Sequence, residues 1–390
     1  MNTLASPGGA TRYDFLDWLR VIAIFVLIFF HSGMMFVGWG WHIVNADTIP
    51  ALQVPMDISH RLRMPLLFVI AGAGMWFALG NRSGAGVLRE RTLRLLLPLV
   101  AGMFLVVPPQ IYCERLFRGQ WDGGYFAFVF ERVLQFQPYP QGDFSWHHLW
   151  FVMYLYVYVL LLLPLLLWWR AARKAVQPGA WIFALAVPLA LNEALLKPLY
   201  PESHKLIGDW YLFNHYFLLT LYGCLLASMR NAWDWFATRR QLSLGLALVV
   251  FGTAMLSFKT GAIEHDTAAD AVIANIFTWC ALMAFIGYGR RYLSFSNPLL
   301  RWARDASYPI YILHQTVIIT IGYWIIQRPW GAWTKFAVVV VATLAICVAM
   351  YEGIRRATVT RVLFGMKAMS KARHAPAPAS RLPKIADDIA

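Results

Sequence analysis

The sequence predicts an all-α fold, a polytopic membrane bundle of about ten transmembrane helices with both termini in the cytoplasm. The 390-residue chain is 59% hydrophobic and only 14% charged, with a mean hydropathy of +0.53. A soluble domain carries about a quarter charged residues. Apolar runs of about twenty residues, the length that crosses a bilayer, recur from end to end. Basic residues gather in every second loop between these runs.

Ten apolar runs are expected to be the spans. They cover residues 17–38, 62–80, 93–112, 149–168, 181–197, 211–228, 241–258, 269–288, 307–326 and 333–353. The fifth and sixth runs are the weakest, because polar residues and a proline interrupt them. The organisation expected is a cytoplasmic N-terminal tail (1–12), a ten-helix transmembrane domain (13–356) and a basic, disordered cytoplasmic tail (357–390).

The distribution of basic residues sets the expected orientation. With the N-terminus inside and the spans alternating, 24 of the 34 Lys and Arg residues fall on the cytoplasmic side. Every cytoplasmic loop then obeys the positive-inside rule. The net charge of +14 is therefore explained by topology in a multi-pass inner (plasma) membrane protein, and nucleic acid is not expected as a partner.

The first run, Asp17 to Ser32 (DWLRVIAIFVLIFFHS), has an arginine at one end and a histidine near the other. Because an α-helix turns about 100° per residue, Arg20 and His31 share one face, about 16 Å apart along the axis. A guanidinium facing lipid is costly, so this face is expected to look into the bundle. Taken singly, Arg20 can snorkel or pair with Asp17, and His31 can bond a neighbouring helix. Together they favour a substrate or proton path.

A second basic cluster opens the third run, in RERTLRLLLP. Arg91 and Arg94 are three residues apart, so on an α-helix they share a face at the cytoplasmic mouth. Paired guanidinium groups bind phosphates, although each arginine alone fits the positive-inside rule. The pattern favours a polyanionic ligand with a long neutral arm, and acyl-coenzyme A has that shape.

The outer side is rich in aromatic residues and histidine. Eight of the ten histidines fall in outer loops or outer helix halves, and residues 113–148 are dense in aromatics, Gly and Pro. Interfacial Trp and Tyr explain part of this pattern, and a carbohydrate-binding surface would use the same flat rings. Both interpretations remain open from the sequence.

Five stretches, taken in order, resemble the acyltransferase family 3 membrane proteins. They are LDWLRVIAIFVLIFFH, HRLRMPLLFVIAG, RTLR, HLWFVMYLY and ASYPIYILH, and the resemblance covers residues 12–355. FHSGMMFVGWGWHIVNAD and RLLLPLVAGMFLVVPPQ resemble more closely a branch that succinylates periplasmic glucans. The resemblance implies transfer of an acetyl, succinyl or similar group from cytoplasmic acyl-CoA to a hydroxyl of an extracytoplasmic glycan. It gives His31 the catalytic role, Arg20 the role of its motif partner, and Arg91 and Arg94 the CoA-side role.

A neutral imidazole can take the proton of an acceptor hydroxyl as it attacks the thioester, so His31 is the expected general base. The oxyanion then needs donors, for which the candidates are Arg63, His148, Trp150 and Tyr308. Acyl-CoA is expected as a co-substrate, with no bound cofactor.

Other polar residues in or next to the apolar runs are secondary candidates, namely Asp17, His60, Glu193 and His314. His314 could orient a site residue or bond a helix neighbour, and Glu193 could relay protons or pair with Lys197. No metal is expected, because the His147–His148 pair would need carboxylates to join it.

Two competing classes remain on the sequence alone. A transporter or flippase of a glycan or small molecule would also have ten spans and buried ionisable residues. A scaffold in a glycan-synthesis complex would function without His31.

Overall fold

The computed structural model describes residues 13–80, 82–172 and 176–369. All regular elements in these residues are helices. The α-helices are α1 (Asp14–Gly33), α2 (Gln53–Leu79), α3 (Gly84–Arg91), α4 (Leu97–Leu105), α5 (Val107–Phe117), α6 (Tyr125–Glu131), α7 (Trp150–Ala172), α8 (Ala186–Leu196), α9 (Trp210–Ser228), α10 (Ala232–Thr260), α11 (Ala268–Tyr292), α12 (Pro298–Ile325), α13 (Ala332–Ile354) and α14 (Thr358–Leu363). Short 3-10 turns are η1 (Pro50–Leu52), η3 (Val133–Gln135), η4 (His147–Leu149) and η5 (Ala180–Leu185), and η2 (Thr92–Leu96) is π-helical.

The all-α membrane prediction is confirmed. Each of the ten predicted runs overlaps a helix, and seven helical segments of the described residues are long and apolar enough to cross a membrane. These seven include α1, α2, the continuous stretch from α3 to α5, α7, α10, α11 and α13. The number of spans and the side on which the termini lie stay predictions.

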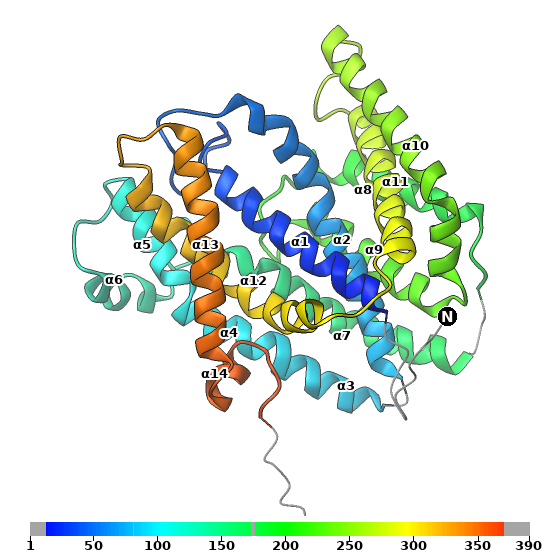
Figure 1. Ribbon diagram of the computed structural model, residues 1–390, viewed down its shortest axis with the longest axis horizontal. Helices are drawn as coiled ribbons and strands as arrows, with labels where there is room; N and C mark the ends of the chain where they lie inside the picture. The colour runs from blue at the N-terminus through cyan, green and yellow to red at the C-terminus, as the bar shows by residue number, and fades with distance from the viewer. Residues whose placement is uncertain (1–12, 81, 173–175, 370–390) are drawn as a thin grey trace, which may run out of the picture.

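Helix α1 runs through the middle of the bundle (Figure 1), where it contacts α2, α11, α12 and α13. Its first turn suits its dipole, since Asp14 and Asp17 lie there, and His31 lies in its last turn. Helix α12 begins at Pro298, and the side chain of Asn297 caps it by accepting from the Leu300 amide at 2.7 Å. These two helices carry the histidines described below.

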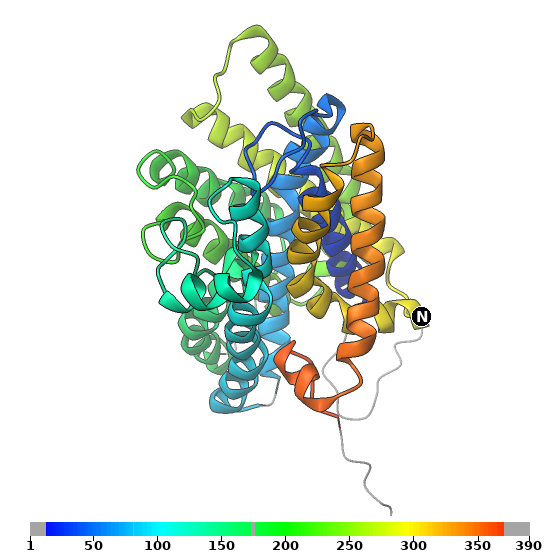
Figure 2. The ribbon, with the colours of Figure 1, turned by 90° about the vertical axis from the view of Figure 1, so that its left-hand side faces the viewer.

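Helices α2 and α9 approach each other through small residues. A Cβ at Gly72 would lie 2.0 Å from the carbonyl oxygen of Thr220, and a Cβ at Gly223 would lie 2.0 Å from that of Val69. Only glycine permits this backbone contact at either position. The α10–α11 hairpin, in contrast, extends beyond the rest of the bundle (Figure 2).

The predicted disordered tail needs one correction. Residues 358–363 form α14, which packs against α4 at the end of the bundle that also holds α3. The carbonyl oxygen of Gly365 accepts a hydrogen bond from Arg94 Nε at 3.3 Å, and this contact explains the order. Residues 370–390 lie outside the described part of the chain.

Candidate active site

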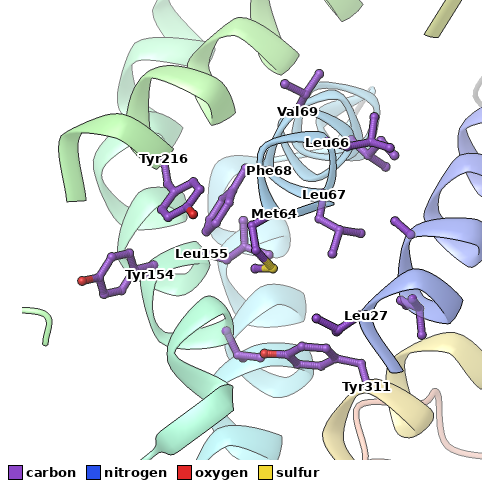
Figure 3. Close-up of a cluster of buried hydrophobic side chains, with 14 of the residues drawn as sticks. Leu27, Met64, Leu66, Leu67, Phe68, Val69, Tyr154, Leu155, Tyr216 and Tyr311 are labelled. Atoms are coloured by element: carbon purple, nitrogen blue, oxygen red, sulfur yellow. The ribbon is translucent and has the colours of Figure 1, made fainter. Parts of the chain in front are cut away.

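A cavity of about 1150 Å³ opens among α1, α2, α7 and α12 and the loops around residues 34–49, 138–148 and 202–207. Figure 3 shows part of the apolar core, including Leu27, Met64 and Tyr311. These three residues also line the cavity. The cavity is larger than the roughly 300–1,000 Å³ that holds drug-sized ligands. It therefore has room for an extended substrate.

Buried polar contacts fix the three loops of this cavity. Asp143 accepts from Arg115 Nε at 2.6 Å and from Arg132 Nε at 2.7 Å, which holds residues 138–144 against α5. Asp209 caps α9 and also accepts from the backbone amides of residues 203 and 204, both at 2.7 Å. Lys335 donates to Asn45 Oδ1 at 2.9 Å and so anchors the loop after α1. Because each loop is anchored by an internal contact, the cavity walls are preformed.

His31 lines the cavity and is paired with His314 of α12. His31 Nδ1 and His314 Nε2 lie 2.8 Å apart, and His314 Nδ1 lies 2.5 Å from the carbonyl oxygen of Tyr311. On its other side, His31 stacks on Trp41 with centroids 6.0 Å apart and planes 7° apart. The imidazole is thus held by a hydrogen bond and a ring contact.

These contacts define the tautomers. A carbonyl oxygen only accepts, so His314 Nδ1 carries a proton and donates it to Tyr311. The Nε2 atom of a neutral His314 is then an acceptor, and it accepts a hydrogen bond from the N–H of His31 Nδ1. His31 Nε2 is left with a lone pair, which is the state that a general base requires.

Arg63 adds a buried cation to the same cavity. It is 8% exposed, and its Cζ lies 3.3 Å from the centroid of the Phe30 ring, in a cation–π contact. Its Nε and Nη1 atoms are buried without a hydrogen-bond partner in the described residues. A guanidinium with unused donors can bind an anionic oxygen.

His148 lines the cavity, but both of its ring nitrogens are in use. Nε2 donates to the carbonyl of Ile312 at 2.8 Å, and Nδ1 lies 3.4 Å from the Gln110 amide nitrogen. An N–H already bound to a carbonyl does not serve a developing oxyanion. In this arrangement His148 joins η4 to α12, and its role as an oxyanion donor stays a prediction.

The other acceptor-site candidates divide into two groups. Trp150 and His60 line the cavity, and Trp150 packs beside His204 with ring centroids 4.6 Å apart. Burial lowers the pKa of His204, so this ring is neutral at pH 7. Tyr308 lies behind the cavity wall, stacked on Tyr311 at 6.3 Å, and its buried hydroxyl has no partner in the described residues.

Arg20 lies on α1 with His31, but it is not among the described residues that line the cavity. Its Nη2 is 2.8 Å from Asp17 Oδ1, so the intrahelical pair considered from the sequence is present. The two residues are eleven positions apart on the helix, so their side chains contact different parts of the protein.

Arg91 and Arg94 also lie outside the cavity lining, and they have different partners. Arg91 Nη2 donates to the carbonyl of Gly74 on α2 at 3.0 Å, whereas Arg94 contacts Gly365 and Glu90. A π-helix begins at Thr92, between the two arginines, so the expectation of one shared α-helical face stays a prediction. Its i→i+5 bonds alter the register that an α-helix would give. Their role toward CoA stays a prediction.

Glu193 belongs to a separate buried network. It lies 2.9 Å from Arg61 Nη1, accepts from Asn275 Nδ2 at 2.7 Å, and pairs with Lys197 at 3.4 Å. The network joins α2, α8 and α11. The i,i+4 pair with Lys197 is thus confirmed, and the paired carboxylate has a packing role.

A cluster of His42, Glu114 and His147 was not predicted as a site. His42 Nδ1 contacts Glu114 Oε2, while Glu114 Oε1 accepts from the Tyr139 hydroxyl at 2.9 Å. Burial and the Glu114 carboxylate raise the pKa of Tyr139 to about 12, so this hydroxyl remains a donor. A ligand atom from each of the three residues lies within 4.8 Å of the other two, so they could hold a metal ion.

One sequence signal could have found this cluster. Glu114 lies two residues after the end of the predicted span 93–112. Burying a carboxylate at the end of an apolar run costs free energy unless the carboxylate has a partner. Asp143, the carboxylate closest in sequence to His147, instead pairs with the two arginines described above.

This chain is similar to known proteins along almost its whole length. A family model described as an acyltransferase domain matches residues 13–352. The chain belongs to this acyltransferase family. Similar curated proteins include glucans biosynthesis protein C of Escherichia coli strain K12, 22% identical over 96% of this chain and 100% of the relative. The same protein of strain O6:K15:H31 is 21% identical with the same coverage. No solved structure matches.

The matched acyltransferase region extends from the start of α1 almost to the end of α13. It therefore includes every element that builds the cavity, with His31 and His314 near its two ends. The resemblance predicted from five short stretches is confirmed at the level of the family.

Proposed function

We propose that this acyltransferase moves an acyl group from cytoplasmic acyl-CoA to a hydroxyl of an extracytoplasmic glycan, in the inner membrane, with His31 as general base. The observation that carries the proposal is the hydrogen-bonded series from the Tyr311 carbonyl through His314 to His31. It leaves a lone pair on His31 Nε2, on a ring that lines a cavity of substrate size.

The chemistry follows from that lone pair. His31 Nε2 takes the proton of the acceptor hydroxyl as the oxygen attacks the thioester carbonyl. The new C–O bond forms while the carbonyl electrons move onto oxygen. When the oxyanion collapses, the C–S bond breaks and the CoA sulfur receives the proton from His31. The positive charge that His31 carries in between is stabilised by its hydrogen bond to His314.

Arg63 is the strongest of the four oxyanion candidates. It lines the cavity beside His60 and has two buried nitrogens without partners in the described residues. Removing one hydrogen-bond donor to an oxyanion typically costs about 2.7–4 kcal/mol. The cation–π contact with the Phe30 ring holds the Arg63 guanidinium in place.

The cavity wall supports a sugar acceptor. Trp39, Trp41, Trp146, Trp150 and Tyr139 all contribute rings to it. Flat aromatic faces with polar edges suit the alternating C–H and O–H surface of a pyranose. The relatives named glucans biosynthesis protein C add weight to a glucan as the acceptor.

The donor must reach His31 from the cytoplasmic side. Tyr311 lines the cavity, and Tyr308 stacks on it from behind. Gly365 packs closely against both the Tyr308 ring and the backbone of Arg94. A Cβ added to Gly365 would lie 2.2 Å from that ring and 3.0 Å from the Arg94 carbonyl oxygen. The two tyrosine rings therefore occupy the space between the cavity and Arg94. We infer that the pantetheine arm passes where these rings now lie, after they have moved.

The test uses the purified full-length protein with a glucan acceptor and either acetyl-CoA or succinyl-CoA. Release of free CoA thiol is measured together with the mass of the glucan. Wild type and a His265→Ala control, whose side chain is 77% exposed, are expected to release CoA and acylate the glucan. His31→Ala is expected to insert normally and lose both activities. Full activity in His31→Ala would reject the base, and no release by wild type with either donor would reject acyl-CoA dependence.

A further inference from the structure

The cluster beside the active-site cavity contains a histidine that the protein leaves unpaired. Neither His147 ring nitrogen has a hydrogen-bond partner in the described residues, and both are shielded from solvent. The ring stacks on His42 with centroids 5.0 Å apart and meets Tyr139 edge-on at 4.7 Å. Leaving a buried polar group unsatisfied costs about 1–3 kcal/mol, so the site is short of one partner.

We propose that His42, Glu114 and His147 bind a Zn²⁺ ion. Two imidazoles and one carboxylate are ligands that zinc favours, and their ligand atoms lie within 4.8 Å of one another. A Zn²⁺ bound to His147 would satisfy one of its two unpaired nitrogens. The inference is independent of the acyl-transfer mechanism, which uses none of these three side chains.

Glu114 is already oriented for one-oxygen coordination. Its Oε1 accepts from the Tyr139 hydroxyl at 2.9 Å and lies 3.0 Å from Arg118 Nη1, whereas its Oε2 faces His42. Contacts of this kind hold a ligating carboxylate in position and are part of the design of natural zinc sites. The carboxylate side chain is fully buried. Zinc would replace the proton that His42 Nδ1 and Glu114 Oε2 now share, so these two atoms would move apart to admit the ion.

His42 requires one proton rearrangement. Its Nδ1 now contacts Glu114 Oε2, and zinc binding there would move the proton to Nε2 or release it. Nε2 lies 3.4 Å from the amide nitrogen of Gln315, which also donates to Gln110 Oε1 at 3.1 Å. Presenting the Gln315 oxygen to His42 would therefore require the Gln315 amide to turn and its bond to Gln110 to break. Gln315 would then play the outer role that ligating histidines commonly have.

The fourth coordination position would face the cavity. His42, His147 and Tyr139 line it, so a water molecule or a hydroxyl of a bound glycan can complete the tetrahedron. Three protein ligands with one open position is the arrangement typical of zinc sites that bind substrates, and closed structural sites use four.

The experiment measures zinc on the full chain in detergent. Chelator-treated protein is given ZnCl₂, excess metal is removed, and bound zinc is counted by mass spectrometry. Wild type and a His265→Gln control are expected to retain about one Zn²⁺ per chain with a raised melting temperature. His147→Gln is expected to lose the metal and the shift. Zinc-free wild type, or equal zinc in wild type and His147→Gln, would overturn the proposal.

A second variant keeps the test informative if His147→Gln does not fold. His147→Cys replaces one zinc ligand by another, so it is expected to retain the metal. With Co²⁺ in place of zinc, this variant should gain a sulfur-to-cobalt absorption band that wild type lacks. Co²⁺ bound without that band would place the metal elsewhere and would also overturn the proposal.

Discussion

Replacing His314 by phenylalanine removes the acceptor that orients the proposed base. His31 Nδ1 would lose its partner at 2.8 Å, and Nδ1 and Nε2 would then compete for the single proton of the neutral ring. The hydrogen bond from His31 Nδ1 to His314 has a charged donor once His31 becomes an imidazolium. A hydrogen bond to a charged group contributes about 1.5–3 kcal/mol of stabilisation. Since each 1.36 kcal/mol is tenfold in rate, kcat should fall by about 10- to 150-fold.

The assay is steady-state release of CoA thiol at saturating acceptor, with the acyl-CoA concentration varied. The effect should appear in kcat and leave KM for the donor unchanged, because His314 does not line the cavity. His314→Gln provides the conservative control. Its amide oxygen can accept from His31 and its NH₂ can donate to the Tyr311 carbonyl, so it should retain most of the activity.

Two results would refute this reasoning. If His314→Phe kept wild-type kcat while His31→Ala was inactive, the histidine pair would not orient the base. If His314→Gln and His314→Phe lost activity equally while both remained folded, the hydrogen bond would not be the property that matters. The His265→Ala protein serves as the unaffected reference in each case.

Three further predictions follow from the same structure. Arg63→Met should lower kcat by about 100- to 1,000-fold with the fold intact, and unchanged kcat would remove Arg63 as the oxyanion donor. Gly72→Ala should destabilise the protein by about 1–3 kcal/mol through contact with the α9 backbone, seen as a lower melting temperature in detergent, whereas Gly245→Ala, which meets nothing within 4 Å, should not. Arg91→Ala with Arg94→Ala should raise KM for acyl-CoA more than it lowers kcat, and unchanged donor kinetics would contradict a phosphate-binding role.

The helices were readable from the sequence because apolar length is a local property. Each of the ten apolar runs predicted as spans overlaps a helix, and this includes the fifth and sixth runs, which polar residues interrupt. The π-helix at Thr92–Leu96 was not predicted, since the preceding chain reads as a continuous α-helical pattern. Arg91, which precedes the π-helix, donates to Gly74, and Arg94 within it donates to Gly365.

The sequence indicates candidate residues where one helix sets the geometry and does not indicate contacts that cross the chain. His31 was found from its place on the first span, and its partner His314 was only one of several polar residues on another span. The pair spans 283 positions of sequence, so no local pattern reveals it. His42 and Glu114 illustrate the same limit, because the loop that carries one meets the helix that carries the other only after folding.

Hydrophobic length and short motifs are local features, so they were enough to identify this chain as a helical membrane protein of the acyltransferase family. The contacts between helices were needed to show which histidine nitrogen holds the lone pair and that Arg63, unlike His148, has donors without partners in the described residues. The same contacts bring a histidine–glutamate cluster to the cavity. Protonation and hydrogen bonding depend on which atoms meet across helices, and packing alone brings those atoms together.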